Sequence, residues 1–186
     1  MLDLGWCRPH QVHGADCLAV TGPGTPGTAD AVVTATAGLG LAVLTADCAS
    51  VALASPEGIA GAVHAGWRGL VAGVVPAAVA AMAALGATTV VAALGPCIRP
   101  ECYEFGPDDL AAVAGAVGAD VSGRTSAGGL ALDLPAAVRA SLAAAGAELV
   151  ADAGVCTACE PGHFSHRRRG DQEREALVVW RPGGRP

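Results

Sequence analysis

Three residues of types that commonly bind metal ions follow short apolar segments of the chain. His13 lies in Gln-Val-His-Gly, Cys48 in Thr-Ala-Asp-Cys, and His64 in Val-His-Ala-Gly-Trp-Arg-Gly. Each segment is typical of a strand end, where the backbone leaves the core and can expose a side chain. Two imidazoles and one thiolate leave a tetrahedral ion with one open position, as in catalytic zinc sites. The pattern therefore predicts a catalytic metal site.

A simpler interpretation of the same residues is possible. His13 and His64 could be polar loop residues, and Cys48 a small buried side chain, since free cysteine is often buried. The neighbours favour the metal site, because Asp47 interrupts an apolar stretch and a buried carboxylate needs a partner. We expect Asp47 either to orient a ligand imidazole or to act as a base.

Arginines offer a possible anion site. Arg68 follows His64 at an expected turn from strand to helix, and Arg167 and Arg168 belong to a basic run near the C-terminus. Such a run is most simply a solvated surface. The alternative is a phosphate or carboxylate subsite, because the planar guanidinium group binds both anions through two hydrogen bonds.

Four further cysteines form two pairs. Cys97 and Cys102 make one pair, and Cys156 and Cys159 form a Cys-x-x-Cys motif. Together they could supply a zinc site with four thiolate ligands. Pro100 interrupts the first pair, and Glu-Pro-Gly after the second opposes a thioredoxin-like helix. We therefore expect these cysteines mostly to pack or to line a pocket.

The ordered motifs of the chain resemble a known family. They are Gln-Val-His-Gly, Ala-Asp-Ala-Val-Val-Thr, Thr-Ala-Asp-Cys, His-Ala-Gly-Trp-Arg-Gly, Leu-Gly-Pro-Cys-Ile before Cys-Tyr-Glu-Phe-Gly, and Cys-Thr-Ala-Cys before Phe-Ser-His-Arg-Arg. The set resembles the YfiH/YlmD family, also called laccase-domain or polyphenol oxidase proteins, over about residues 6–180. The resemblance implies that His13, Cys48 and His64 hold one zinc ion.

The resemblance also implies an activity. Members of that family act on purine nucleosides by phosphorolysis and deaminate adenosine, whereas older descriptions call them copper laccases. We therefore expect a zinc-dependent purine nucleoside enzyme with a nucleoside and phosphate as its partners. Asp47, Cys48 and Arg68 are the expected catalytic residues, and Arg68, Arg167 and Arg168 the expected phosphate-binding residues. The alternatives are a copper-dependent polyphenol oxidase and a metal-binding protein with little activity.

Copper chemistry can be tested against the composition. Two histidines and one cysteine are also the ligands of a blue-copper site, which usually adds an axial methionine. The chain has two methionines, Met1 and Met82, and the second lies in an apolar segment. Multicopper oxidases need many histidines, commonly as His-x-His, whereas this chain has five and no such pair. The residue count therefore disfavours a multicopper site.

The position of the first motif suggests a short N-terminus. Family members usually carry several dozen residues before Gln-Val-His-Gly, including Gly-Gly-x-Ser and Ser-Leu-Asn segments. Twelve residues precede His13 here. We expect a single YfiH-like catalytic domain over residues 1–186 that is short at this end. If the pocket needs the preceding strands, the chain should bind zinc but turn over nucleosides weakly.

Composition excludes several other classes of protein. Of the 186 residues, 52% are hydrophobic and 15% are charged, as in a compact enzyme. A net charge of −6 argues against binding to nucleic acid or anionic membranes. The apolar segment over residues 71–85 contains Pro76 and is too short for a membrane span. Seven cysteines without a small secreted scaffold favour the reducing cytoplasm, and we expect a monomer or weak homo-oligomer.

The pattern of elements predicts an α/β fold. Strands are expected over residues 32–33, 41–44, 50–54, 59–64, 88–94, 130–134, 148–151 and 176–180. Helices are expected over residues 69–85, from residue 107, and over residues 135–145. Pro76 should kink the first helix or show that it starts later. The family resemblance implies a layered αββα arrangement of mixed sheets with outer helices.

Overall fold

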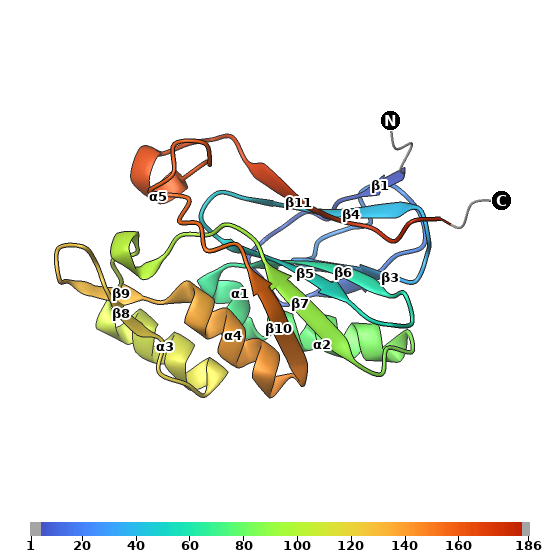
Figure 1. Cartoon of the computed structure of the whole chain (residues 1–186), viewed down its shortest axis with the longest axis horizontal. Helices are drawn as coiled ribbons and strands as arrows, with labels where there is room; N and C mark the ends of the chain where they lie inside the picture. The colour runs from blue at the N-terminus through green and yellow to red at the C-terminus, as the bar shows by residue number, and fades with distance from the viewer. Residues whose placement is uncertain (1–4, 184–186) are drawn as a thin grey trace.

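The computed structural model describes residues 5–183 and consists of two mixed β-sheets and a layer of helices (Figure 1). The larger sheet has six strands in the order β10-β7-β5-β6-β3-β2. Its inner pairs are antiparallel, and the outermost pair at each edge is parallel. These strands are β2 (Cys17–Ala19), β3 (Ala31–Thr34), β5 (Ala49–Ala54), β6 (Ala60–Ala65), β7 (Val90–Leu94) and β10 (Ala147–Asp152).

The smaller sheet covers one face of the larger one. It has the order β1-β4-β11, with β1 (Gly5–Cys7) parallel and β11 (Glu175–Val179) antiparallel to β4 (Leu39–Thr45). The chain passes from β4 directly to β5, so the turn between them connects the two sheets. A separate hairpin pairs β8 (Ser122–Arg124) with β9 (Leu130–Leu132).

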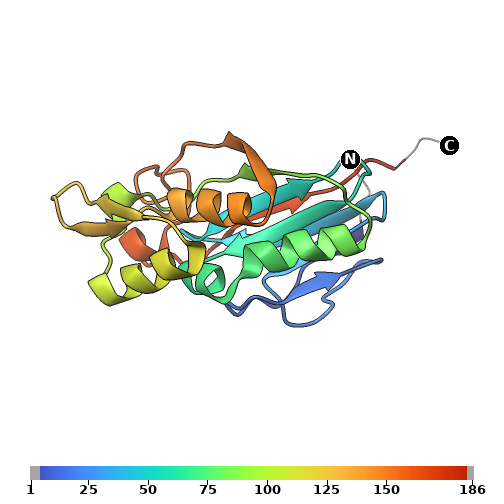
Figure 2. The same ribbon diagram turned by 90° about the horizontal axis from the view of Figure 1, so that it is seen from below.

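Helices α1, α2 and α4 cover the other face of the six-stranded sheet, and α3 packs against α1 and α4, as Figure 2 shows from below. A short α5 lies beyond the end of the smaller sheet, and the 3-10 helix η1 follows β7. The helices are α1 (Trp67–Ala72), α2 (Val74–Ala84), α3 (Pro107–Val117), α4 (Leu134–Ala144), α5 (His166–Arg169) and η1 (Pro100–Cys102). Within residues 5–183, no helix is long and apolar enough to cross a membrane.

The central strands are buried on both faces because they lie between the helices and the smaller sheet. β3 and β6 are buried along their whole length. Strands of this kind show continuous apolar runs rather than alternation. A side chain at Gly61 of β6 would meet Val33 at 3.2 Å and Leu53 at 3.3 Å. His64 is the exception in β6, a polar side chain in an otherwise apolar strand.

The structure confirms the expected α/β class with mixed sheets and outer helices. The expectation of one helix over residues 69–85 is wrong. Gly73 has a φ of 93° and separates α1 from α2. This left-handed conformation costs glycine little and ends α1. Pro76 lies in the first turn of α2, where the missing N–H costs no helical hydrogen bond.

Candidate metal centre and substrate cavity

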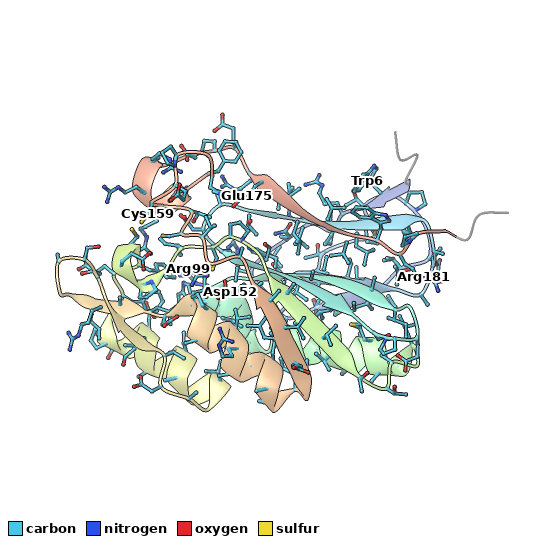
Figure 3. All side chains as sticks on the ribbon, in the orientation of Figure 1. Trp6, Arg99, Asp152, Cys159, Glu175 and Arg181 are labelled. Atoms are coloured by element: carbon cyan, nitrogen blue, oxygen red, sulfur yellow. The ribbon has the colours of Figure 1, made fainter. Side chains whose placement is uncertain are left out.

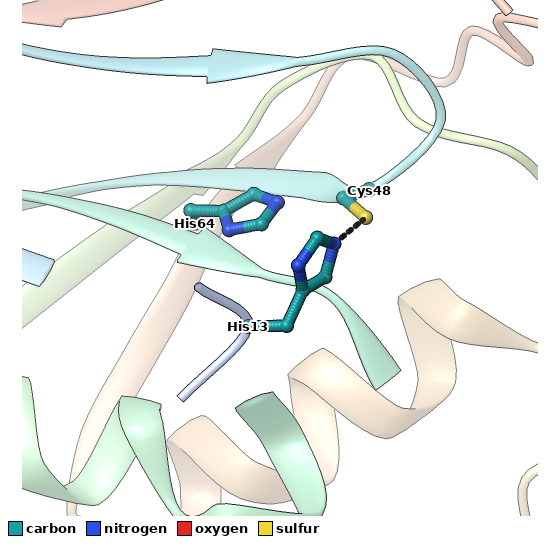
Figure 4. Close-up of side chains that lie close together, drawn as sticks. All are labelled: His13, Cys48 and His64. Carbon is teal, nitrogen blue, oxygen red and sulfur yellow. Dashed lines mark hydrogen bonds between the residues drawn. The ribbon is translucent and has the colours of Figure 1, made fainter. Parts of the chain in front are cut away.

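Three metal-binding side chains converge where the two sheets meet (Figure 4). His13 comes from the loop before β2, Cys48 from the turn between β4 and β5, and His64 from β6. Their donor atoms all lie within 4.8 Å of one another. Cys48 Sγ is 3.8 Å from His13 Nε2, and the two imidazole ring centres are 4.8 Å apart. The structure therefore brings the predicted ligand set together.

A buried carboxylate holds two of these residues in place. Asp30 is fully buried directly before β3, and its Oδ1 accepts a hydrogen bond from His64 Nδ1 at 2.7 Å. The backbone N–H groups of Val12, His13 and Gly14 also donate to it, at 3.1, 2.9 and 2.7 Å. Because Nδ1 is used by the carboxylate, Nε2 of His64 is left for a metal ion.

The backbone around the ligands adopts unusual conformations. His13 and Asp47 are the two non-glycine residues with positive φ in the described part of the chain, at 61° and 85°. Such conformations are uncommon outside glycine and concentrate at functional sites. Gly66 packs so closely that a side chain there would meet His13 at 2.9 Å and Cys48 at 3.0 Å. This approach explains the glycine after His64 and Ala65.

Gln11 connects the His13 loop to the smaller sheet through two hydrogen bonds. Its side-chain Nε2 donates to the carbonyl oxygen of Leu44, and its Oε1 accepts from the Leu44 N–H, both at 2.8 Å. An amide side chain can satisfy both backbone groups of one residue in this way. Leu44 lies in β4, just before the turn that carries Cys48. Gln11 therefore links the segments that supply two of the three ligands.

Electrostatics favour a charged array in the metal-free site. Burial opposes the charge of the Cys48 thiolate, but hydrogen bonds and positive charge from His13 and His64 lower its pKa to about 7. Burial also opposes the His64 imidazolium, yet Asp30 and Cys48 raise its pKa to about 9. Burial opposes the Asp30 carboxylate too, and the hydrogen bonds it accepts still lower its pKa. A metal ion would take the place of the His64 proton.

The three residues present fit a zinc ion. With Zn–N bonds of about 2.0–2.1 Å and a Zn–S bond of about 2.3 Å, tetrahedral ligand atoms lie about 3.3–3.6 Å apart. The 3.8 Å between Cys48 Sγ and His13 Nε2 is close to that range. The buried acceptor behind His64 is the usual partner of a metal-bound imidazole. Two imidazoles and one thiolate leave the fourth position to a ligand from solution.

The ligand set lies in the wall of a cavity of about 540 Å³. Pockets of about 300–1,000 Å³ are typical of small-molecule sites. The lining contains four of the five histidines of the chain and four arginines. They are His10, His13, His64, His166, Arg8, Arg68, Arg167 and Arg174. The cavity therefore combines metal ligands with groups that bind anions.

Two of these arginines are held against aromatic rings. The Arg68 guanidinium lies 4.3 Å from the centre of the Trp67 ring, and that of Arg167 lies 4.7 Å from the Tyr103 ring. Both rings pack edge-on against Phe105, with ring centres 5.5 Å apart for Trp67 and 5.2 Å apart for Tyr103. Within residues 5–183, neither arginine has a carboxylate within 4.0 Å. Arg167 Nη1 donates to the Glu104 carbonyl at 2.9 Å, so the other N–H groups of Arg167 and the guanidinium of Arg68 are the donors left for an anion in the cavity.

Asp47 does not hydrogen-bond to a ligand imidazole. Its Oδ1 accepts from Thr157 Oγ1 at 2.7 Å, and its Oδ2 accepts from the Arg167 N–H at 2.6 Å. The carboxylate that holds a ligand imidazole is Asp30 instead. Asp47 thereby fixes the segment that carries Arg167 at the cavity wall. Because both of its oxygens accept hydrogen bonds, we assign Asp47 a positioning role.

The structure separates the predicted arginines. Arg68 and Arg167 line the cavity, whereas the described lining does not include Arg168. The Arg168 N–H donates to Ser165 Oγ at 3.1 Å, and this serine side chain thereby caps the start of α5. Arg174, from the same basic run, lines the cavity in its place.

Sequence reasoning missed several residues of the site. Asp30 stands directly before the apolar run of β3, in the Ala-Asp-Ala-Val-Val-Thr motif, and an acidic residue at that point was the available signal. His166 directly precedes the basic run, and that position was the available signal for it. Tyr103 lies in the Cys-Tyr-Glu-Phe-Gly motif, which was the available signal, whereas His10 reaches the cavity through loop geometry and no pattern marked it.

Known proteins are similar to this chain over most of its length. A purine nucleoside phosphorylase of Streptomyces coelicolor, SCO2081, is 48% identical over 177 residues, which cover 92% of this chain and 73% of that protein. One from Streptomyces griseus, ORF3, is 48% identical over 178 residues, covering 92% and 72%. The crystal structure of YlmD from Geobacillus stearothermophilus superposes with a TM-score of 0.84 at 31% identity, covering 96% of this chain and 74% of that one.

A family model agrees with these individual matches. It matches residues 2–182, nearly the whole chain, and is described as multi-copper polyphenol oxidoreductase laccase. The expected resemblance to YfiH/YlmD proteins is confirmed by the superposition on YlmD. The chain thus belongs to the multi-copper polyphenol oxidoreductase laccase family, and its fold is similar to that of YlmD.

Proposed function

We propose that this protein is a zinc-dependent purine nucleoside enzyme that cleaves adenosine- and inosine-type nucleosides by phosphorolysis and deaminates adenosine. The observation that carries the proposal is the presence, in one cavity, of a zinc donor set and arginines without carboxylate partners. Relatives with 48% identity bear the name purine nucleoside phosphorylase. The cavity volume of about 540 Å³ suits a nucleoside with phosphate.

The residues at the metal site prepare it for an ion without further rearrangement. Asp30 fixes the tautomer and direction of His64, and it holds the His13 loop through three backbone N–H groups. Cys48 is largely a thiolate above its pKa of about 7. Zinc held by His13, Cys48 and His64 would supply a Lewis acid that polarises a substrate oxygen or activates water.

Phosphorolysis needs a bound phosphate beside the nucleoside. A phosphate oxygen forms a bond to C1′ of the ribose while the C1′–N bond to the purine breaks, and the purine leaves with a proton. Arg68 and Arg167 are suited to hold the phosphate, because guanidinium groups match its oxygens in pairs. Their stacking on Trp67 and Tyr103 limits the freedom lost on binding.

Deamination differs in its second substrate. Water adds to the purine carbon that bears the amine, and ammonia leaves, so no phosphate is required. The two proposed activities should therefore share His13, Cys48 and His64 but differ in their need for Arg68. This difference allows the two reactions to be separated by a single substitution.

A copper-dependent polyphenol oxidase is the second candidate, and the description of the matching family model favours it. The same three ligands would suit copper, although such sites usually add a weak axial methionine. Met82 is the only methionine in residues 5–183, and it is fully buried on α2 in the apolar core. The described cavity lining contains no methionine.

One experiment compares these functions directly. The purified protein is analysed for metal, then incubated with adenosine, with adenosine and phosphate, and with a phenol under oxygen. The proposal expects bound zinc, inosine from adenosine alone, and free purine with ribose 1-phosphate when phosphate is present. Zinc without product would indicate a metal-binding protein, and bound copper with phenol oxidation would support the oxidase. Either result would contradict the proposal.

A further inference from the structure

A second cluster of metal-ligating side chains lies away from the first. The Sγ atoms of Cys102, Cys156 and Cys159 all lie within 4.8 Å of one another, and those of Cys102 and Cys159 are 3.3 Å apart. Cys102 ends η1, and the other two belong to a turn after β10. Figure 3 shows Cys159 at the left of the molecule, above Arg99.

Cys97 does not join this cluster, so four thiolates do not meet as one zinc site. Its side chain is fully buried in the apolar core, and burial raises its pKa to about 12. Its backbone pairs with Cys156 as an isolated bridge. The packing role expected from the sequence therefore describes Cys97, whereas the other three cysteines form a separate group.

A backbone N–H group is directed at the sulfur of Cys156. The Arg99 N–H donates to Cys156 Sγ at 3.4 Å. The Cys159 N–H donates to the Cys156 carbonyl at 3.1 Å, which closes the turn that carries both cysteines. Hydrogen bonds from neighbouring groups to the ligand side chains are typical of metal centres.

A fourth donor stands at the edge of the cluster. Glu101 Oε1 is 4.0 Å from Cys159 Sγ. Around a tetrahedral zinc ion, sulfur ligands lie about 3.8 Å apart, and sulfur and oxygen ligands about 3.5 Å. The spacings of the cluster therefore need only small side-chain movements to reach this geometry. Cys159 is exposed, so an ion has access from solution.

We propose that Cys102, Cys156 and Cys159 form a second metal site, which takes a thiophilic divalent ion such as Zn²⁺ with Glu101 as its fourth ligand. Thiolate-rich tetrahedral sites select such soft ions. A disulfide between Cys102 and Cys159 is the competing arrangement. It would use two of the three sulfurs and would leave out Cys156, whose sulfur accepts the Arg99 N–H.

The ion at this site would join two segments of the cavity wall. Tyr103, next to Cys102, lines the cavity, and Thr157, between the two other cysteines, donates to Asp47 beside Cys48. Cys102 and Cys159 lie 57 positions apart in the sequence. A metal bridge over such a distance stabilises the folded chain because it restricts the unfolded one. The second site would therefore be structural.

Counting zinc in reduced, zinc-reconstituted full-length protein tests this proposal without reference to activity. Two ions per chain are expected in the unmodified protein, and one each in His64→Ala and Cys159→Ser. The double variant should hold none. Cys17→Ser, which changes a cysteine outside both clusters, is the matched control and should keep two ions. Glu101→Gln should keep both ions but lose one faster to a chelator.

Two results would overturn the proposal. One is a single zinc ion that His64→Ala removes and Cys159→Ser leaves unchanged. The other is a Cys102–Cys159 disulfide, found by peptide mass mapping of the purified protein before any reductant is added. If Cys159→Ser does not fold, titration of His64→Ala with Cd²⁺ gives the same decision, because thiolate binding produces an absorption band. Saturation of that band at one equivalent of Cd²⁺ supports the second site. The absence of a band contradicts it.

Discussion

The two clusters of metal-ligating side chains differ in how the protein prepares them. His13, Cys48 and His64 are backed by the fully buried Asp30, and their mutual charges lower the pKa of Cys48 to about 7. In the cysteine cluster, burial raises the pKa of Cys156, whose sulfur accepts a hydrogen bond from the Arg99 N–H. Cys48 and His64 therefore favour their charged forms before an ion arrives, whereas the cysteine cluster ionises when an ion binds.

The surroundings of the two clusters differ in the same way. The first lies in the wall of a cavity of about 540 Å³ and leaves one position open, as catalytic zinc sites do. The cysteine cluster, with Glu101, offers the four donors of a complete tetrahedral site. The group at the fourth position therefore separates a candidate catalytic site from a candidate structural one.

The largest effect is expected from His64→Ala. The variant removes one of three ligands and leaves Asp30 without its imidazole partner, so the first site should lose its zinc. Both phosphorolysis and deamination should fall below detection, while the cysteine cluster keeps its ion. His163→Ala is the control, since His163 pairs with Glu175 and not with this site. Full nucleoside turnover by His64→Ala would place the chemistry elsewhere.

Asp30→Asn should have the next largest effect, because it changes the feature that most separates the two clusters. Each oxygen of Asp30 accepts two hydrogen bonds, so an NH₂ group at either position would face two donors. Loss of such a partner typically lowers metal affinity by about 10–100-fold. Zinc competition with a chromophoric chelator measures this change. Asp16→Asn, at an exposed position of the same loop, should leave affinity unchanged.

Much of the fold followed from local sequence patterns. The predicted strands match β3 to β7 and β9 to β11 to within two or three residues, because central strands buried on both faces are continuous apolar runs. The break between α1 and α2 was misplaced, because Pro76 is the more obvious helix breaker. Gly73 determines the break instead, through a backbone conformation that a sequence pattern does not display.

The ligands of the candidate site were predictable, but their supports were not. Cys48 and His64 stand out as polar residues near the ends of apolar runs, and His13 stands out through its Gln-Val-His-Gly motif, although it lies in a loop and not at a strand end. The role of Asp30 depends on the pairing of β3 with β6, which brings it to His64 across 34 positions of sequence. Asp47 adjoins Cys48 in the sequence, so the sequence offered it as the carboxylate that orients a ligand imidazole. Asp30 makes that contact instead. Contacts between distant segments need the tertiary structure.

Arg68→Lys should have a moderate effect that is confined to one reaction. Lysine keeps the positive charge but loses the paired hydrogen bonds and the stacking on Trp67. Loss of one charged hydrogen bond costs about 1.5–3 kcal/mol, or at least about tenfold in phosphorolysis. Deamination of adenosine without phosphate should stay unchanged. Arg139→Lys, on the exposed face of α4, is the control. Equal losses in both reactions would contradict the phosphate assignment.

The smallest effect is a difference in thiol reactivity between the two clusters in metal-free protein. Cys159 is the more exposed of the two compared thiols, so access alone predicts that it reacts faster than Cys48. The pKa values predict the opposite, because Cys48 has a pKa of about 7 and that of Cys159 is raised by its contact with Cys102. The thiolate is the reactive form. At neutral pH, Cys48 should therefore be alkylated first.

The pH dependence of alkylation provides the measurement. The rate at Cys48 should rise as pH increases through about 7 and level off above about 8, while the rate at Cys159 should still be rising at pH 9. Iodoacetamide labelling followed by peptide mass spectrometry resolves both cysteines in one sample. Asp30→Asn should move the Cys48 midpoint upward, because the His64 imidazolium that stabilises the thiolate depends on Asp30. Zinc should protect both thiols. A Cys48 midpoint near the ordinary thiol value of about 8.5 would show that the charged array does not form.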